Sequence, residues 1–418
     1  MLGSNENLIH DVRAKFAHVD SCPYQGTRVF FENAGGALTL NSVAEKSQEM
    51  AAIPDNQGRD NPAAHELVRI IAKAKDDTKL FFNASGGQVF VGESGTELLF
   101  RLISAAILGA EKGGIVLGST LEHPASRSAC IRWADIAGKD YVSVPHNAET
   151  GSVTAEDYLP HISPDTRVAT ILHTSPVSGM AVDVGAIAKA IRNVAPDCYI
   201  IIDGIQHAAH GGIDIDSYGI DGYVISPYKA FSRHGYGLAW ISDRFTQLPH
   251  DGLIGAPQAQ WELGTRDTGA YATFSEVVAY FEWLGSQVTD STDRRARIEA
   301  AGKAIHAHEK DLTDAMLFGI GNLKGLTEMP EVGVLCGAEN PLREGLVSMT
   351  VKGMDAETLV SALRERGIRV HARKADHYSA NILTPLGLED CVRVSMCHYN
   401  SEQEVAQFLT AMQEIVAL

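Results

Sequence analysis

Several short segments of this chain are apolar at nearly every position. Tyr199–Asp203 and Tyr223–Ser226 are of this kind, and Gly237–Ile241 follows them after a polar turn. A segment without polar alternation is typical of a strand that other elements cover on both faces. These three segments therefore predict strands of a mostly parallel sheet with helices on both sides.

The same pattern extends toward the amino terminus. Further strands are predicted at Val89–Val91, Ile115–Gly118 and Arg167–Leu172. Apolar residues recur at helical spacing in Leu67–Phe82, and a helix at Val184–Val194 is expected to cross back to the strand that ends at residue 203. Strands that alternate with helices indicate the α/β class.

The pattern changes in the last third of the chain. From about Ser275 onward, long helical stretches lead to a strand, a helix, two strands and a final helix, which indicate a smaller α+β domain. The polar residues before Gly26 predict an N-terminal helix. We expect a large cofactor-binding domain at residues 24–280 and a small domain made of residues 1–23 and 281–418.

Composition and charge narrow the functional classes. A chain of 418 residues is long enough for two domains, and its net charge of −17 disfavours binding to nucleic acid or to acidic membranes. The first residues lack the apolar region of a signal peptide, and no apolar run reaches membrane-spanning length. The six cysteines lack CxxC spacing, so we expect reduced thiols, no metal site and a cytoplasmic protein.

Two charged side chains follow the ends of neighbouring predicted strands. Asp203 ends one strand and Lys229 follows the next, and functional side chains of parallel sheets gather at this edge. A lysine can form a Schiff base with pyridoxal phosphate, while an acid pairs with the ring nitrogen of that cofactor. Alternatively, the lysine is solvated and the aspartate caps a turn.

The residues around this pair resemble those of a known family. Ile-Ile-Asp-Gly-Ile-Gln at 201–206, Ser-Pro-Tyr-Lys at 226–229 and the glycine-rich segment after them are similar to the class V aminotransferase branch of fold-type I pyridoxal-phosphate enzymes. That branch includes cysteine desulfurases, selenocysteine lyases and isopenicillin-N-epimerase-like proteins. The resemblance covers nearly the whole chain. It implies a mostly parallel, seven-stranded large domain, a smaller α+β domain and a homodimer with cofactor sites near the interface.

The resemblance also implies which residues hold the cofactor. Its phosphate would lie at the start of a helix, at Gly95 and Thr96, and His123 would stack on its ring. Gly264 and Thr265 would reach the phosphate bound by the partner subunit. Without the resemblance, these residues are a helix cap, a surface histidine and a polar loop. The expected cofactor contacts are Gly95, Thr96, His123, Asp203, Gln206, Ser226, Tyr228, Lys229, Gly264 and Thr265.

Substrate contacts are implied in the same way. The family segment beside the substrate carboxylate corresponds to Asn33, Ala34 and Gly35. Arg393 precedes a Tyr-Asn-Ser-x-x-Glu-Val run, which is similar to the run after the family's carboxylate-binding arginine. A guanidinium can hold a carboxylate through two parallel hydrogen bonds. The alternatives are an ordinary glycine turn and an arginine paired at the surface.

Two features depart from cysteine desulfurases. Pro176 stands where those enzymes usually carry an asparagine, and its side chain offers no hydrogen bond. The stretch at residues 371–390 lacks the cysteine that forms a persulfide in desulfurases, and we expect Cys391 and Cys397 to be buried thiols. The stretch carries instead Arg373, Lys374, His377 and Tyr378. These side chains could supply acid–base groups, bind a second substrate carboxylate, or be solvated.

We expect a pyridoxal-phosphate-dependent enzyme that acts at Cα of a small amino acid. Its catalytic residues would be Lys229, His123 and Asp203, with freed Lys229 as the base for the Cα proton. Overall likeness favours a cysteine desulfurase-like C–S lyase without the usual persulfide loop. Pro176 and Gly-Thr-Arg-Asp at 264–267 support an amino-acid racemase or epimerase, and a class V aminotransferase is a further alternative. The intact Lys229, Asp203 and Arg393 disfavour an accessory protein without turnover.

Overall fold

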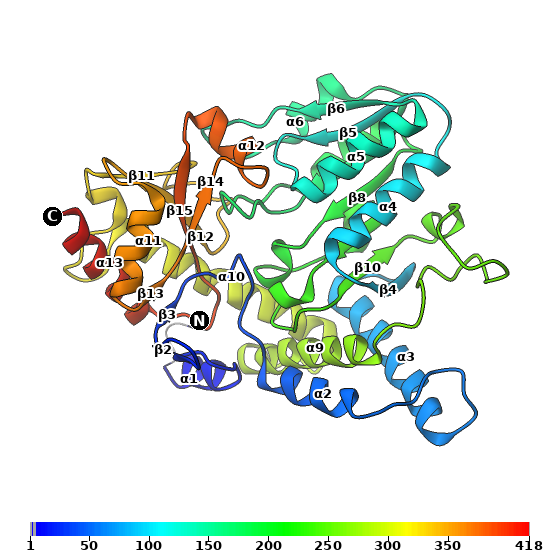
Figure 1. The fold of residues 1–418 in the computed structure, drawn as a ribbon, viewed down its shortest axis with the longest axis horizontal. Coiled ribbons are helices and arrows are strands. Elements are labelled where there is room, and N and C mark those ends of the chain that lie inside the picture. Colours follow the sequence, from blue (N-terminus) through cyan, green and yellow to red (C-terminus); the bar gives the residue numbers. More distant parts are fainter. Residues whose placement is uncertain (1, 3–5, 418) are drawn as a thin grey trace.

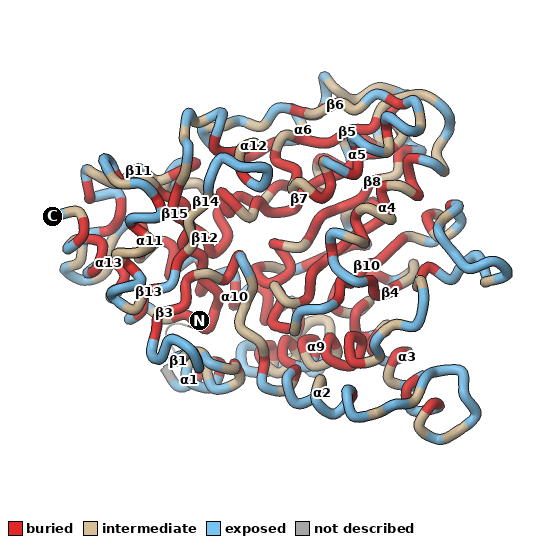
Figure 2. Tube along the Cα trace, in the orientation of Figure 1, coloured by how far each residue is buried: buried red, intermediate tan, exposed pale blue. Residues whose placement is uncertain are grey.

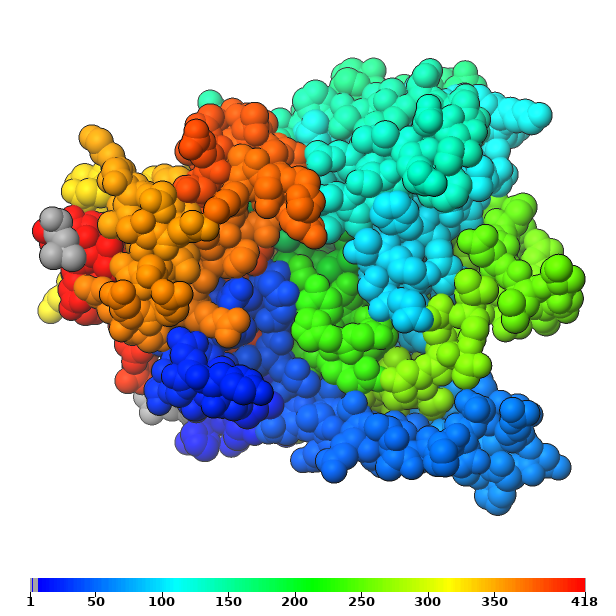
Figure 3. Space-filling view, in the orientation of Figure 1, coloured from blue at the N-terminus to red at the C-terminus, as the bar shows by residue number. Residues whose placement is uncertain are grey.

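The computed structural model describes residue 2 and residues 6–417. It consists of a large unit built around one sheet and a smaller unit that contains the C-terminal strands (Figure 1). In Figure 3 the smaller unit is mostly orange and red, and the large unit is mostly cyan and green. Helix α10 (Arg294–Phe318) joins the units, because it packs against α9 (Thr268–Val288) and against α13 (Glu402–Val416).

The large sheet has seven strands in the order β4-β10-β9-β8-β7-β5-β6. Strand β10 runs antiparallel to β4 and to β9, and the other pairs are parallel. The predicted mostly parallel, seven-stranded sheet is therefore confirmed. The strands are β4 (Gln88–Gly92), β5 (Ile115–Ser119), β6 (Asp140–Val144), β7 (Thr166–Leu172), β8 (Tyr199–Asp203), β9 (Gly222–Ile225) and β10 (Gly237–Ile241).

One strand of this sheet is absent from the sequence predictions. Strand β6 is an edge strand, and Val144 is its only fully buried residue. Its sequence, Asp-Tyr-Val-Ser-Val, therefore lacks the continuous apolar run that marks the covered strands. The other six strands lie within one or two residues of their predicted positions.

Two layers of helices cover the large sheet. Alternate residues of a strand face opposite layers, so Ile201 packs with α4 and α5, whereas Ile200 and Ile202 pack in the cluster that contains α3, α7 and α9. Figure 2 shows these strands as buried segments inside the unit. Cover on both faces explains why the strands are apolar throughout. The helices of this unit are α2 (Asn41–Ala51), α3 (Pro62–Phe82), α4 (Gly95–Gly109), α5 (Pro124–Ala137), α6 (Ala155–Tyr158), α7 (Val184–Val194), α8 (Ile215–Tyr218) and α9.

The strand directions bring several chain segments to one edge of the sheet. Strands β5, β7, β8 and β9 are parallel, so their carboxyl ends share that edge. Strand β4 also ends there, because β10 is antiparallel to both β4 and β9. The turns after five strands therefore meet at one place, where ligands of open α/β sheets usually bind.

The smaller unit is a four-stranded antiparallel sheet with helices against it. Its strand order is β11-β12-β15-β14. The predicted succession of strand, helix, two strands and helix is present, with β11 as an additional edge strand. The elements are β11 (Val332–Val334), β12 (Leu346–Val351), α11 (Ala356–Glu365), β13 (Ile368–Arg369), β14 (His371–Lys374), α12 (Ala380–Leu383), β15 (Asp390–Ser395) and α13.

The N-terminal segment contacts both units. Val12 of α1 (Glu6–Ala14) packs in the same core cluster as strands of the large unit. Strand β3 (Val29–Phe30) instead pairs in parallel with β13 of the smaller unit, after the short hairpin of β1 (Ser21–Cys22) and β2 (Gly26–Thr27). The domain boundaries that the sequence suggests stay a prediction. No helix in the described part of the chain is long and apolar enough to cross a bilayer.

A buried carboxylate stabilises the large sheet at the edge opposite the carboxyl ends of its parallel strands. Asp221 accepts hydrogen bonds from Arg192 Nη2 at 2.6 Å and from Arg244 Nε at 2.6 Å, and it also accepts the N–H of Ile200 at 3.0 Å. We expect Asp221→Ala to lower the free energy of unfolding by about 3 kcal/mol, because two guanidinium groups then keep only backbone carbonyl partners and lose their carboxylate, and the Ile200 amide loses its acceptor. Urea denaturation followed by circular dichroism measures this change.

The exposed Asp135 on α5 provides the matched control. Asp135→Ala should change the free energy of unfolding by less than about 0.5 kcal/mol. Equal effects of the two substitutions would show that the Asp221 contacts add nothing to stability.

Candidate active site

A cavity opens at the sheet edge where the strand ends meet. It is lined by residues that follow β4, β5, β7, β8 and β9: Thr96, His123, Leu172, Pro176, Asp203, Ile205, Gln206, Ser226, Tyr228 and Lys229. Seven of these are sequence-predicted cofactor contacts. Folding thus brings together side chains that are up to 133 positions apart, from Thr96 to Lys229.

Lys229 ends a short 3₁₀ turn, Pro227–Lys229, after β9. Its Nζ donates a hydrogen bond to Gln206 Oε1 at 3.1 Å. Burial and, to a lesser degree, the charge of Arg393 lower the pKa of Lys229 to about 7. The amine is therefore neutral in a large share of molecules at neutral pH, which makes it a usable nucleophile and base.

Asp203 provides the negative charge of the cavity. It ends strand β8, is 2% exposed, and accepts the N–H of Ile205 at its Oδ1 atom at 3.1 Å. Burial raises its pKa to about 6, whereas the Ile205 N–H and the charge of Lys229 act in the opposite direction. A cationic ligand group beside this carboxylate would be stabilised, because water screens little of the interaction.

His123 forms part of the cavity wall at the start of α5. Its Nδ1 accepts the N–H of Ala125 at 3.2 Å and so caps the helix. Burial, followed by the charges of Lys229 and Arg373, lowers its pKa to about 4. The ring is therefore neutral at neutral pH, and its proton is on Nε2 because Nδ1 is an acceptor.

A second buried acid next to His123 was missed by the sequence analysis. Glu122 is fully buried, and its Oε1 accepts the N–H of Leu172 at 3.0 Å. Burial and the nearby charge of Asp203 raise its pKa to about 8, so most of it is neutral at neutral pH. Its position directly before His123, at the end of a strand, was the only signal in the sequence.

The start of α4 provides an anion-binding end. Ser94 caps the helix by accepting the N–H of Glu97 at 3.1 Å, which leaves the earlier amides of the first turn free to bind a ligand. A Cβ atom at Gly95 would collide with Ser226 Oγ and lie 2.6 Å from Ile205 Cδ1, so only glycine allows this close approach. Thr96 lines the cavity and is exposed in the single chain.

Arg393 reaches the cavity region from the smaller unit. It lies on β15, is 3% exposed, and its Nη1 donates to the backbone carbonyl of Pro176 at 2.7 Å. Pro176 therefore contributes through its main chain, which the sequence argument about its side chain could not show. Burial, then Arg373, lowers the pKa of Arg393 to about 10, so it remains charged at neutral pH.

The predicted substrate turn lies beside this arginine. A Cβ atom on Gly35 would be 3.6 Å from Arg393 Nη2. Ala34 N–H donates to Ser395 Oγ at 2.8 Å, and Asn33 Nδ2 donates to the carbonyl of Ser395 at 2.8 Å. The Asn33 side chain thus fastens the turn to β15, and its role toward a substrate stays a prediction.

A network of buried histidines lies behind Gln206. Gln206 Nε2 is 3.2 Å from His210 Nε2, and His210 Nδ1 is 2.8 Å from a carboxylate oxygen of Glu309 on α10. His207 Nδ1 contacts Glu344 at 3.0 Å in the same region. These contacts connect the cavity wall to α10 and to the segment before β12. The spacing of these residues in the sequence did not indicate the pairings.

Gly264 and Thr265 do not line this cavity. Both are exposed, in the loop before α9. The neighbouring Arg266 forms an ion pair with Glu93, which directly precedes the cap of α4, so the loop approaches the anion-binding end. Contact with the cofactor of a partner subunit stays a prediction.

All six cysteines are free, and the thiols near β15 are buried as expected. Burial raises the pKa of Cys391 to about 11, so this group is a thiol and not a thiolate at neutral pH. Cys397 is 1% exposed, and burial raises its pKa as well. Neither residue has the exposed, low-pKa thiolate that a reactive cysteine needs.

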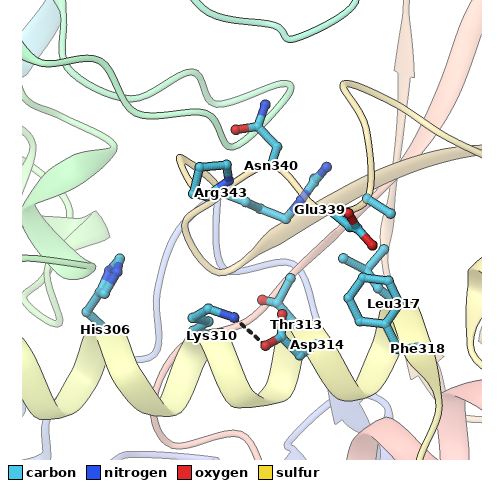
Figure 4. Close-up of a pocket in the computed structure, with 11 residues that line it drawn as sticks. His306, Lys310, Thr313, Asp314, Leu317, Phe318, Glu339, Asn340 and Arg343 are labelled. Atoms are coloured by element: carbon cyan, nitrogen blue, oxygen red, sulfur yellow. Dashed lines mark hydrogen bonds and ion pairs between the residues drawn. The ribbon is translucent and has the colours of Figure 1, made fainter.

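Another hollow lies beside α10, and helix residues such as His306, Lys310 and Asp314 line it (Figure 4). Residues 338–341 and Arg343 form the other wall, and Lys310 is paired with Asp314. None of the predicted site residues lines this hollow.

The cavity at the sheet edge fits pyridoxal phosphate. A buried amine, a buried carboxylate and the amino end of a helix match the aldehyde, the ring nitrogen and the phosphate of that cofactor. The absent Cβ of Gly95 provides the close approach beside Ser226, and His123 provides a flat wall.

Comparisons with known proteins agree with this chemistry. Residues 29–408 match the aminotransferase class-V family. The chain is 24% identical over 436 residues to the aminotransferase-like protein FGM3 of Gibberella zeae, which covers 99% of this chain and 100% of that protein. It is 26% identical over 416 residues to the cysteine desulfurase-like protein ustD of Aspergillus flavus, with coverages of 94% and 88%.

A solved structure shows the same fold. The apo cysteine desulfurase from Thermococcus onnurineus superposes with a TM-score of 0.82 at 20% identity and covers 98% of each chain. Because the family match spans most of the sequence, this protein belongs to the class V aminotransferases, a family of pyridoxal-phosphate-dependent enzymes with this α/β fold.

Proposed function

We propose that this protein acts at Cα of a small amino acid, in a desulfurase-like lyase reaction that uses no persulfide cysteine. The observation that carries the proposal is the pair formed by Lys229 and Asp203, which face one buried cavity at the carboxyl edge of the sheet. The relative that is named as cysteine desulfurase-like supports the lyase class. The buried state of Cys391 and Cys397 supports the absence of a persulfide step.

Each residue of the site has a distinct task in this proposal. Arg393 holds the α-carboxylate through two parallel hydrogen bonds, and the absent side chain of Gly35 leaves room for it. The neutral Nζ of Lys229 accepts the Cα proton. When bound, pyridoxal phosphate supplies the electron sink for the charge that develops at Cα.

The other residues orient the cofactor and exclude water. Asp203 holds a positive ring nitrogen, the first turn of α4 with Thr96 holds the phosphate, and His123 covers one face of the ring. Gln206 lies within hydrogen-bond distance of Lys229 and so can contact the phenolic oxygen next to the aldehyde. Tyr228 and Ser226 complete the wall.

A racemase or epimerase is the second candidate function. Pro176 and the Gly-Thr-Arg-Asp run at 264–267 favour it, since both resemble epimerase-like members of the branch. Removal of the Cα proton by Lys229 is common to this reaction, to elimination and to aminotransfer. A class V aminotransferase is therefore the remaining alternative.

We further infer a homodimer in a reducing compartment such as the cytoplasm. The anion-binding end beside Thr96 is exposed in one chain, and a partner subunit would close it with Gly264 and Thr265. The six free cysteines support a reducing environment.

The first prediction concerns the acidity of the reactive amine. In the cofactor-free protein, carbamylation of Lys229 by cyanate should reach its half-maximal rate near pH 7, because burial and Arg393 favour the neutral amine. Below that pH the amine is protonated and unreactive; above it the rate should be constant. Peptide mass spectrometry across a pH series measures the rate, with the exposed Lys112 as internal comparison. A Lys229 profile identical to that of Lys112 would contradict the prediction.

The second prediction concerns the covalent link. After loading with pyridoxal phosphate, borohydride should fix the mass of the reduced cofactor on the peptide that contains Lys229. Lys229→Ala should abolish this label and turnover, whereas Lys189→Ala, at an exposed position of α7, should change neither. Labelling elsewhere, or none at all, would refute the proposed site.

The third prediction concerns the charge of Asp203, and a set of substrates then identifies the reaction type. Asp203→Asn should keep the borohydride-reducible link but lower kcat by about 100-fold or more, because it removes a preorganised charge. Incubation with cysteine, with each alanine enantiomer and with an added keto acid distinguishes sulfide release, racemisation and aminotransfer. Full activity of the Asp203→Asn variant would remove this residue from the mechanism.

A further inference from the structure

Two arginines lie on one face of the small sheet beside the cavity. Strands β14 and β15 pair so that His371 opposes Arg393 and Arg373 opposes Cys391. Directly opposed residues share a face of the sheet, and so do residues two positions apart along a strand. Arg373 and Arg393 are therefore diagonal neighbours, with Cβ atoms roughly 7–8 Å apart or somewhat less.

Neither guanidinium is ion-paired with a carboxylate of the described residues. In the part of the chain that the structure describes, no acidic oxygen lies within 4.0 Å of either group. Arg393 donates to the Pro176 carbonyl, and its buried Nε has no hydrogen-bond partner. Arg373 donates from Nε to Ser379 Oγ at 2.9 Å. The more distant charges of Glu32 and Asp376 oppose the fall in the pKa values of Arg393 and Arg373, respectively. Two like charges thus lie close together with no carboxylate in direct contact, an arrangement that an anionic ligand would stabilise.

The second arginine lies close enough to act on the catalytic groups. Burial is the main cause of the low pKa values of Lys229 and His123, and the charge of Arg373 adds to it in both cases. The ring of Tyr378 lies between, with its centroid 6.1 Å from that of His123 and 5.9 Å from the Arg373 guanidinium carbon. Arg373 is therefore near the cavity and not on a remote surface.

The segment after β14 is hydrogen-bonded to the large unit. Asn381 Nδ2 donates to the carbonyl of Thr120 at 2.8 Å. Lys374, which alternates with Arg373 along β14, points to the other face and pairs with Glu357 at 2.6 Å. His377 is exposed. Of the charged side chains in this segment, Arg373 is the one placed to meet a substrate.

We propose that the substrate is a short amino acid with a second acid group on its side chain, which binds Arg373 while the α-carboxylate binds Arg393. This inference rests on the proposed function and names its substrate class. A guanidinium matches a carboxylate or a sulfinate through paired N–H donors, and two diagonal neighbours on one face of the sheet can hold the two acid groups of a short amino acid. A neutral side chain would leave Arg373 without an ion-pair partner.

The test uses the holoenzyme and the change in cofactor absorbance on substrate binding. L-Aspartate and L-cysteine sulfinate carry the second acid group, and L-asparagine and L-alanine lack it. At least one acidic amino acid should bind about tenfold or more tighter than asparagine, the size of effect expected for charged hydrogen bonds. The better of the two acids then distinguishes a side-chain carboxylate from a sulfinate.

Variants at Arg373 assign the preference to this residue. Arg373→Gln should abolish the preference while asparagine and alanine bind as before, and Arg373→Lys should retain part of it. Arg364→Gln, at an exposed position of α11, should leave all affinities unchanged.

The outcomes separate this inference from the proposed function. If neutral and acidic amino acids perturb the absorbance at equal concentrations, or if Arg373→Gln keeps the preference, the inference is overturned and the enzyme assignment stands. If no amino acid perturbs the absorbance, the proposed function is wrong, and the inference falls with it.

Discussion

The site depends on the amine of Lys229 and the carboxylate of Asp203, which line the same buried cavity. In the described part of the chain, neither group forms an ion pair. Burial shifts the pKa of Lys229 down to about 7 and that of Asp203 up to about 6, so each group is driven toward its neutral form. Such a pair is costly unless a ligand satisfies it. A flat cofactor with an aldehyde at one position and a basic nitrogen at another would meet both groups at once.

The fold explains how this arrangement is reached. Covered parallel strands place Asp203 and Lys229 at one edge, and the antiparallel β10 lets β4 end there too, so the amino end of α4 faces the same cavity. The small antiparallel sheet then adds Arg393 and Arg373 from adjacent strands. In the proposed function, the large unit supplies the cofactor groups, and the smaller unit supplies positive charge for the substrate.

Much of this arrangement could be predicted from the sequence, for physical reasons. Strands that are covered on both faces are apolar throughout, so the sequence pattern predicts their positions. Functional side chains gather at the ends of such strands, so those ends predict the site. Strand β6 was missed because most of its residues are at least partly exposed. The carbonyl of Pro176 as a partner of Arg393 could not be predicted, since every residue has a carbonyl. The high pKa of Glu122 depends on three-dimensional burial, and the approach of Arg373 to Arg393 depends on strand register.

The most direct test of the account is a crystal structure of the protein loaded with pyridoxal phosphate. We expect continuous density from Lys229 Nζ to the cofactor, a ring nitrogen within hydrogen-bond distance of Asp203, and the phosphate at the first turn of α4. A cofactor bound elsewhere, or one in this cavity whose ring nitrogen points away from Asp203, would contradict it.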